Sequence, residues 1–154
     1  MKRYSVTILG MGPRGLSVLE RIAALAGSRQ LLLDINLVEP GECGPGAHAV
    51  RQPQHLLINT VASQVTMFPT AGAVQLAPVC ATPSLTAWAR QSGYRRVGDS
   101  YYRLSGTGSG AGAGAAITES DYLPRSLLGE YLAWAYQQVV AALPAGVTLT
   151  HHRL

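Results

Sequence analysis

A short turn near the N-terminus, with three glycines between Gly10 and Gly15, constrains the fold more than any other feature of this sequence. It directly follows residues 4–9, an apolar and β-branched run that is typical of a buried strand. Apolar residues then recur at helical spacing over residues 14–26, and a second apolar run covers residues 32–38. Strand, turn, helix and strand form one βαβ unit, which predicts an α/β fold with a parallel sheet.

The spacing of the three glycines, G-x-G-x-x-G, predicts the chemistry of the turn. In this pattern Gly12 lets the backbone approach a pyrophosphate, and Gly15 lets the helix pack closely on the strand. The helix start adds unpaired N–H groups and the positive end of the helix dipole. The motif alone is weak evidence in a chain with 17 glycines, but its place between a strand and a helix strengthens it. We therefore predict a binding site for the pyrophosphate of a dinucleotide.

An acidic residue, Glu39, follows the second predicted strand and completes this pattern. It comes 24 positions after Gly15, slightly beyond the usual ~20, so we expect a longer loop near residues 29–33. The first helix should end at Gly27 and Ser28. A carboxylate at this place accepts hydrogen bonds from ribose hydroxyls and repels a 2′-phosphate, which predicts FAD or NAD rather than NADP at this turn.

The middle of the chain is less regular. Residues 41–80 are rich in glycine and proline and predict a long irregular segment that lines a site or is mobile. A short helix is predicted over residues 82–91, with Thr82 as its cap and Pro83 at its first position. Residues 105–116 are almost entirely Gly, Ala and Ser and predict a flexible loop. We do not interpret them as a second phosphate loop, because we expect no strand before them and no helix after them.

The C-terminal part returns to regular structure. Residues 126–143 predict an amphipathic helix, broken by the sequence from Pro144 to Gly146, and residues 147–150 begin another strand. The predicted apolar face of this helix consists of Leu128, Leu132, Ala135, Val139 and Ala142. We interpret residues 1–154 as the N-terminal part of one three-layer Rossmann-like domain that is incomplete at its C-terminus.

Composition limits the other classes of function. Twelve Lys and Arg against eight Asp and Glu give a net charge of +4, dispersed along the chain, which argues against nucleic-acid binding. Cys43 and Cys80 match no metal-binding or CxxC spacing, so we expect two reduced thiols, no metal and a cytoplasmic protein. We expect neither a signal peptide nor a membrane partner. The charged fraction of 13%, against the usual ~25%, suits a piece that buries surface against further domains.

Several segments together resemble one known family. Val6–Ser17 resembles the opening of FAD-dependent oxidoreductases, and His55–Thr60 followed by Met67–Pro69 is similar to a pattern of flavin-containing monooxygenases. Tyr122–Tyr136 resembles the later segment in which a proline turn leads into a helix. With Gly44–Gly46 added, the chain resembles the bacterial FAD-NAD(P)-binding family, related to flavin monooxygenases and lysine or ornithine N-hydroxylases.

The resemblance implies FAD as cofactor, NAD(P)H as co-substrate and oxygenation of a small-molecule substrate by the complete enzyme. It implies a cofactor-binding set of Gly10, Gly12, Pro13, Arg14, Gly15, Leu16, Glu39, Gly46, Leu57, Asn59, Thr60 and Arg125. Within that set, Asn59 would lie near the isoalloxazine with Leu57 and Thr60, whereas Arg125 either faces a cofactor or caps the next helix. His55 is a candidate acid or base, although a histidine at a loop edge is more often structural. Trp88, Tyr101 and Tyr102 are expected to be packing residues.

Family members are much longer and carry a second glycine motif for NAD(P)H. We therefore expect a fragment or a subunit of a split enzyme that needs further domains or a partner chain for turnover. The alternatives are an NAD-binding fragment without flavin and a non-catalytic Rossmann-like interaction subunit.

Overall fold

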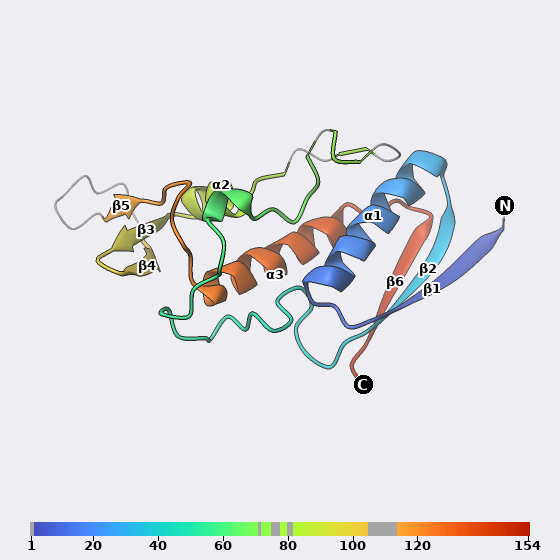
Figure 1. Cartoon of the computed structure of the whole chain (residues 1–154). Coiled ribbons are helices and arrows are strands. Elements are labelled where there is room, and N and C mark those ends of the chain that lie inside the picture. Colours follow the sequence, from blue (N-terminus) through green and yellow to red (C-terminus); the bar gives the residue numbers. More distant parts are fainter. Residues whose placement is uncertain (1, 71, 75–77, 80–81, 105–113) are drawn as a thin grey trace. The chain divides into compact units, whose positions relative to one another are not determined.

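A computed structural model describes residues 2–70, 72–74, 78–79, 82–104 and 114–154 (Figure 1). The chain divides into two compact units. The first consists of Met1–Ala47, Met67–Ala81 and Leu132–Leu154, and the second of His48–Thr66 and Thr82–Tyr131.

A three-stranded parallel sheet forms the centre of the first unit. Its strands are β1 (Arg3–Leu9), β2 (Leu32–Val38) and β6 (Val147–His152), in the order β1-β2-β6. Helix α1 (Pro13–Arg29) connects β1 to β2, as Figure 1 shows. The predicted βαβ unit and the parallel sheet are confirmed.

The two faces of this sheet differ in chemistry. Leu33, Ile35 and Leu37 of β2 are buried on one face, and they alternate with polar residues that point the other way. On the polar face, Asp34 Oδ1 accepts hydrogen bonds from Arg3 and from the Thr148 hydroxyl, both at 2.6 Å. These contacts cross all three strands and hold the polar face together.

Strand β1 is an edge strand of the described sheet. It pairs only with β2, and Ile8 is its one buried residue, while Leu9 is 77% exposed and Tyr4 48% exposed. The prediction of a buried strand was therefore wrong for most of its length. Its apolar and β-branched residues indicated a strand correctly, but the same composition suits an edge or a centre, and pairing decides between them.

Helix α1 continues past the glycine where the sequence predicted its end. It runs through Gly27 and Ser28 to Arg29, and Gln30 closes it in the left-handed conformation with φ 51°. The predicted long loop near residues 29–33 is consequently absent, since β2 already begins at Leu32. The extra residues between the glycine turn and Glu39 lie in a longer helix.

The second unit contains a hairpin that the sequence reasoning did not predict. Strands β3 (Tyr94–Val97) and β4 (Ser100–Arg103) pair antiparallel, and β5 (Ala115–Ala116) pairs with β3. A strand therefore ends shortly before the glycine-rich run, contrary to expectation. Residues 105–113 of that run lie outside the described residues, and its last two residues belong to β5.

Helix α2 (Leu85–Gln91) and the short 3₁₀ helix η1 (Ala62–Gln64) complete the second unit. The cap and the first residue of helix α2 each lie two residues later than predicted, and the cap is Ser84, whose hydroxyl accepts a hydrogen bond from the Ala87 N–H at 3.3 Å. The predicted cap Thr82 and the proline after it precede the helix. Trp88 lies against Tyr94 and Tyr131, with ring centroids 5.9 and 5.6 Å away, which confirms its packing role.

Helix α3 (Arg125–Ala141) contributes residues to both units. Four of the five predicted face residues, Leu128, Leu132, Ala135 and Val139, are buried. Ala142 is exposed and lies beyond the helix end. The first half of the helix also buries Leu127 and Tyr131, so it packs on more than one side. None of the described helices has the length and hydropathy that crossing a membrane requires.

Two glycines of helix α1 allow a matched test of this packing. A Cβ on Gly15 would overlap the carbonyl oxygen of Gly10, so Gly15→Ala should lower the free energy of unfolding by on the order of 2 kcal/mol. Gly27→Ala is the control, because its Cβ would only touch Pro144 at 3.5 Å and alanine favours a helix by up to about 1 kcal/mol. Urea unfolding followed by circular dichroism measures both; equal stability of the two variants would contradict the close approach.

Candidate functional site

The glycine turn leaves the start of helix α1 without an internal cap. Gly10 takes the left-handed conformation at φ 82°, and Gly12 precedes the helix in an extended conformation with no side chain to cap it. Pro13 occupies the first helical position, and the first turn contains no acidic residue. The N–H groups of Gly12, Arg14 and Gly15 make no hydrogen bond to any described residue. Three donors are therefore available to an anion at the positive end of the helix.

Met11 fixes the turn from two sides. Its N–H donates to Glu39 Oε2 at 2.8 Å, and its carbonyl accepts a hydrogen bond from the Gly44 N–H at 2.7 Å. The Met11 side chain is fully buried. The backbone on which the three free N–H groups depend is thus held in place without using any of them.

Glu39 connects the end of β2 to this turn and to β6. Its second carboxylate oxygen accepts the Gly41 N–H at 3.0 Å, and its own N–H donates to the His152 carbonyl at 3.0 Å. The hydrogen bond from the Met11 N–H, and then that from Gly41, lower the pKa of the Glu39 carboxyl, so it is ionised at neutral pH. The sequence located this acid beside the turn correctly, and its predicted contact with ribose hydroxyls stays a prediction.

The loop after β2 packs directly on the glycine turn. Gly46 has φ 55°, and a Cβ on it would lie 2.8 Å from Gly12 Cα. In return, a Cβ on Gly12 would lie 3.3 Å from Gly46 Cα, so the space that Gly12 leaves is filled by this loop. The sequence reasoning explained Gly12 by the approach of a pyrophosphate alone and missed this second cause.

Gly44 is the site residue that the sequence reasoning missed. It has φ 110°, donates to Met11, and its missing Cβ allows the Leu132 carbonyl of α3 within 2.5 Å of the Cβ position. The Gly44-Pro45-Gly46 sequence was the available signal, but only Gly46 was placed in the site. Pro13 and Arg14 lie within the turn and Leu16 directly after it is fully buried, and the predicted contacts of all three with a cofactor stay predictions.

A buried thiol, that of Cys43, lies in the loop after β2, four residues beyond Glu39. Cys43 Sγ is 3.7 Å from His151 Nε2 and accepts a hydrogen bond from the Tyr136 hydroxyl. Burial raises the pKa of the Cys43 thiol, and it raises the pKa of Tyr136 to about 12. Both groups are neutral at physiological pH, so this cluster stabilises the loop and supplies no nucleophile. Cys80 lies outside the described residues.

The remaining predicted site residues belong to the second unit. Leu57 forms a β-bridge with Pro124, and Arg125 donates from its backbone N–H to the Leu56 carbonyl and from Nε to the Leu57 carbonyl at 2.8 and 3.3 Å. Arg125 is the first residue of α3, where a cation opposes the helix dipole, so it does not cap the helix. Its side chain instead holds the segment before Ile58.

Asn59, Thr60 and His55 are exposed, and their side chains make no hydrogen bond to the described residues. The structural interpretation of His55 as a hydrogen-bonding loop residue is therefore unsupported. The roles of Asn59 and Thr60 towards a cofactor, and that of His55 as an acid or base, stay predictions.

The glycine turn, the uncapped helix and the anchored acid define a dinucleotide-binding α/β domain. A family model described as FAD-NAD(P)-binding matches residues 7–154, and the chain belongs to this family. The description names FAD and NAD(P), in agreement with the two cofactors, FAD and NAD(P)H, that the sequence resemblance implied.

Three curated proteins are similar to this chain. An "L-aspartate N-monooxygenase (nitrosuccinate-forming)" of Streptomyces davaonensis is 35% identical over 99% of the chain, and one of the same name from Streptomyces cremeus is 39% identical over 99%. A nitrosuccinic acid synthase of Aspergillus oryzae is 34% identical over 96%. The chain spans 23%, 23% and 20% of the lengths of these relatives.

Removing the charge of Glu39 should weaken dinucleotide binding. Glu39→Gln keeps the shape but offers one carbonyl oxygen where the carboxylate offers two, so the Met11 or Gly41 contact weakens. We expect the Kd for FAD to rise about tenfold or more, measured by quenching of flavin fluorescence. Glu42→Gln is the control, because Glu42 is exposed and three residues away. Equal affinity of the two variants would refute this role of Glu39.

The same carboxylate should make stability depend on acid pH. Since the folded pKa of Glu39 is below its ordinary value of 4.5, its contribution is fully present above pH 4.5 and is lost as the pH falls through the folded pKa. Wild type should therefore lose more stability than Glu39→Gln between about pH 6 and about pH 3. Urea unfolding midpoints at both pH values measure this. Equal losses of stability in wild type and Glu39→Gln would show that groups other than Glu39 control the acid transition.

Proposed function

We propose that this chain is the FAD-binding part of an NAD(P)H-dependent monooxygenase that oxidises the amine nitrogen of a small amino acid. The observation that carries the cofactor assignment is the uncapped start of α1, where three N–H groups stay free while Met11 is held between Glu39 and Gly44. The two N-monooxygenases among the relatives support the reaction, although the chain matches only 23% of their length.

The residues of the first unit fit the ADP half of FAD. In this proposal the N–H groups of Gly12, Arg14 and Gly15 donate to the pyrophosphate, and the carboxylate of Glu39 accepts from the ribose hydroxyls. A carboxylate has about four acceptor positions, and the Met11 and Gly41 N–H groups use two of them, so Glu39 can serve both purposes. Its negative charge disfavours a 2′-phosphate at this turn.

In this proposal a bound flavin would supply the redox chemistry, with NAD(P)H as the source of reducing equivalents and O₂ as the oxidant. The chain's own residues then bind and orient the cofactor. The predicted role of Asn59, with Leu57 and Thr60, near the isoalloxazine belongs to this proposal and is tested by the flavin absorbance bands of Asn59→Ala. Further domains or a partner chain would supply the second glycine motif for NAD(P)H, and a cytoplasmic location is part of the same proposal.

A side chain that accepts hydrogen bonds from the free N–H groups should weaken FAD binding without lowering the stability of the fold. Gly12 has φ −75° and ψ −168°, a conformation that suits a capping residue, so the carboxylate of Gly12→Asp can accept the N–H groups at the start of α1. It should weaken FAD binding strongly, because it takes up the donors and repels the pyrophosphate. Its fold should be at least as stable as that of Gly12→Ala, since such a cap contributes about 1 kcal/mol.

Gly12→Ala is the matched control, because both variants introduce the same Cβ against Gly46. We expect a Kd for FAD at least about a hundredfold higher for the aspartate than for the alanine variant, measured by calorimetry beside urea unfolding. If the aspartate variant binds FAD as well as the alanine variant does, the pyrophosphate does not lie at this helix start and the proposal fails.

A further inference from the structure

The peptide unit between Glu39 and Pro40 joins the anchored acid to the loop after β2. Because proline has no N–H, the Glu39 carbonyl is the one hydrogen-bonding group of this unit. In a regular parallel ladder, a backbone N–H of the neighbouring strand would donate to such a carbonyl. No described backbone N–H does so, and His151 Nε2 of β6 lies 2.8 Å from this oxygen instead. A side chain therefore fixes the peptide unit that follows Glu39.

The His151 ring is held in the orientation that this contact needs. A carbonyl oxygen only accepts, so Nε2 carries the hydrogen. Cys43 Sγ lies 3.7 Å from Nε2 and 3.9 Å from Nδ1, so the thiol packs beside the ring, and the Tyr136 hydroxyl donates to the same sulfur. His151 pairs in register with the buried Leu37, so its ring lies on the apolar face of the sheet, where these neighbours restrict its rotation.

Both backbone polar groups of Glu39 are thus bound by β6. The N–H donates to the His152 carbonyl at 3.0 Å, and the carbonyl accepts from His151. Fixing the peptide units on both sides of a residue fixes its φ and ψ, and with them the direction in which its side chain leaves the backbone. The same constraint keeps the Gly41 N–H within 3.0 Å of the carboxylate.

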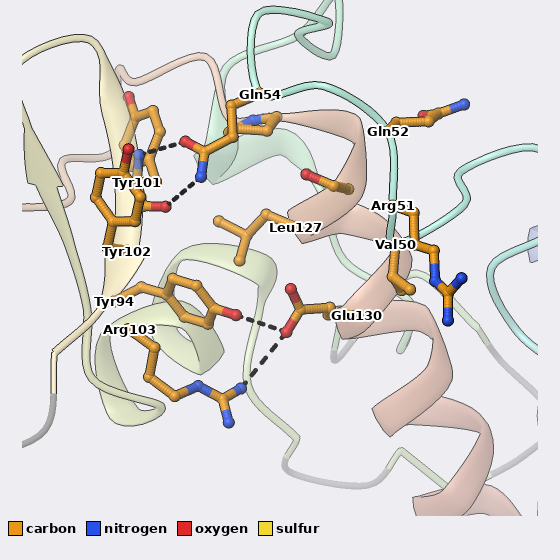
Figure 2. A pocket seen from close by; sticks show the side chains of 12 residues that line it. Val50, Arg51, Gln52, Gln54, Tyr94, Tyr101, Tyr102, Arg103, Leu127 and Glu130 are labelled. Carbon is orange, nitrogen blue, oxygen red and sulfur yellow. Dashed lines mark hydrogen bonds and ion pairs between the residues drawn. The ribbon is translucent and has the colours of Figure 1, made fainter.

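A carboxylate of the second unit is oriented in a different way. Glu130 lines a cavity of about 330 Å³ beside the β3–β4 hairpin, and Arg51 lines it from another segment (Figure 2). Glu130 Oε2 accepts from the Tyr94 hydroxyl at 2.5 Å and lies 3.6 Å from the Arg103 guanidinium, so side chains orient it (Figure 2). Glu39 forms no ion pair with any described residue. Its direction depends on its backbone, and therefore on the contact at its carbonyl.

We propose that His151 is a positioning residue for the ribose contact: its hydrogen bond to the Glu39 carbonyl aims the carboxylate at the ribose hydroxyls of the cofactor. The contact of Glu39 with ribose belongs to the function proposed above, and the role of His151 rests on it. Without the His151 donor the peptide unit after Glu39 can turn, so the carboxylate meets the hydroxyls less well. The site should then discriminate poorly between a ribose that has its 2′-hydroxyl and one that lacks it.

Displacement of FAD from the purified chain by ADP and by 2′-deoxy-ADP measures this discrimination through the recovery of flavin fluorescence. Both probes carry the two phosphates, and they differ in one hydroxyl. Wild type should bind ADP at least about tenfold more tightly, since a hydrogen bond to a charged group contributes that much. His151→Leu has no donor, so its ratio of the two Kd values should fall to within about twofold. A histidine with a merely structural role would change both Kd values equally and leave the ratio unchanged.

Two amide variants keep the test decisive if the leucine variant fails to fold. The side-chain nitrogen of His151→Gln can lie where Nε2 lies, whereas the shorter side chain of His151→Asn does not reach the Glu39 carbonyl. Both replace the ring by a polar amide, so their losses of packing are similar, and urea unfolding measures those losses. The glutamine variant should keep a ratio of at least about fivefold, and the asparagine variant should lose it.

His152→Leu is the matched control. His152 is the next residue of β6 and is also partly buried, but its ring lies on the other face of the sheet, where Nε2 is 3.0 Å from Asn36 Oδ1. The substitution keeps the backbone carbonyl that accepts the Glu39 N–H. The preference for ADP should therefore stay within about twofold of wild type, even where stability falls.

Three outcomes overturn the proposal and leave FAD binding intact. A wild-type ratio near one shows that Glu39 does not contact the 2′-hydroxyl. An unchanged ratio in His151→Asn, or in a folded His151→Leu, makes His151 a structural residue. A loss of the ratio in His152→Leu as well shows that discrimination follows general stability. Wild type that binds no FAD at all refutes the proposed function, and the role of His151 with it.

Discussion

The hydrogen bond from the Met11 N–H to Glu39 is the contact on which the geometry of the first unit depends. It joins the turn after β1 to the residue after β2, two points 28 positions apart in the chain. The Glu39 backbone also binds the end of β6, so one residue aligns the carboxyl ends of two strands with the glycine turn. Ligands of open α/β sheets bind at this end of the strands, so the contact that shapes the sheet edge also shapes the site.

This arrangement explains why several glycines occur close together. Gly15 faces the carbonyl of Gly10, Gly12 faces Gly46, and Gly44 faces the backbone of α3. Each pair brings two backbones closer than a Cβ would permit. The glycine turn is consequently one part of a layered backbone contact, in which the loop after β2 supports the turn and α3 supports that loop.

The sequence predicted the elements that depend on residues close together in the chain. The glycine turn, α1 and β2 follow from spacing within about 40 residues, and α3 follows from its own periodicity. The edge position of β1 was not predictable, because exposure depends on pairing and not on composition. The β3–β4 hairpin was missed because Arg95, Arg96 and Arg103 hide its strand pattern, although the two residues Gly98-Asp99 between the strands are a known hairpin signal. The cavity was also unpredictable, since tertiary packing alone brings Arg51, Arg103 and Glu130 to its walls.

The start of α1 shows how the site and the stability of the domain are coupled. Most helices gain about 1 kcal/mol from a capping side chain, and an acidic first turn adds a further favourable interaction with the dipole. Helix α1 has neither and carries Arg14 in its first turn. Folding therefore leaves donors unsatisfied that an incoming anion can satisfy, so a ligand that binds only the folded chain stabilises it according to its concentration and Kd. A capping residue would stabilise the ligand-free chain by using the same N–H groups, and a turn that binds pyrophosphate must do without it.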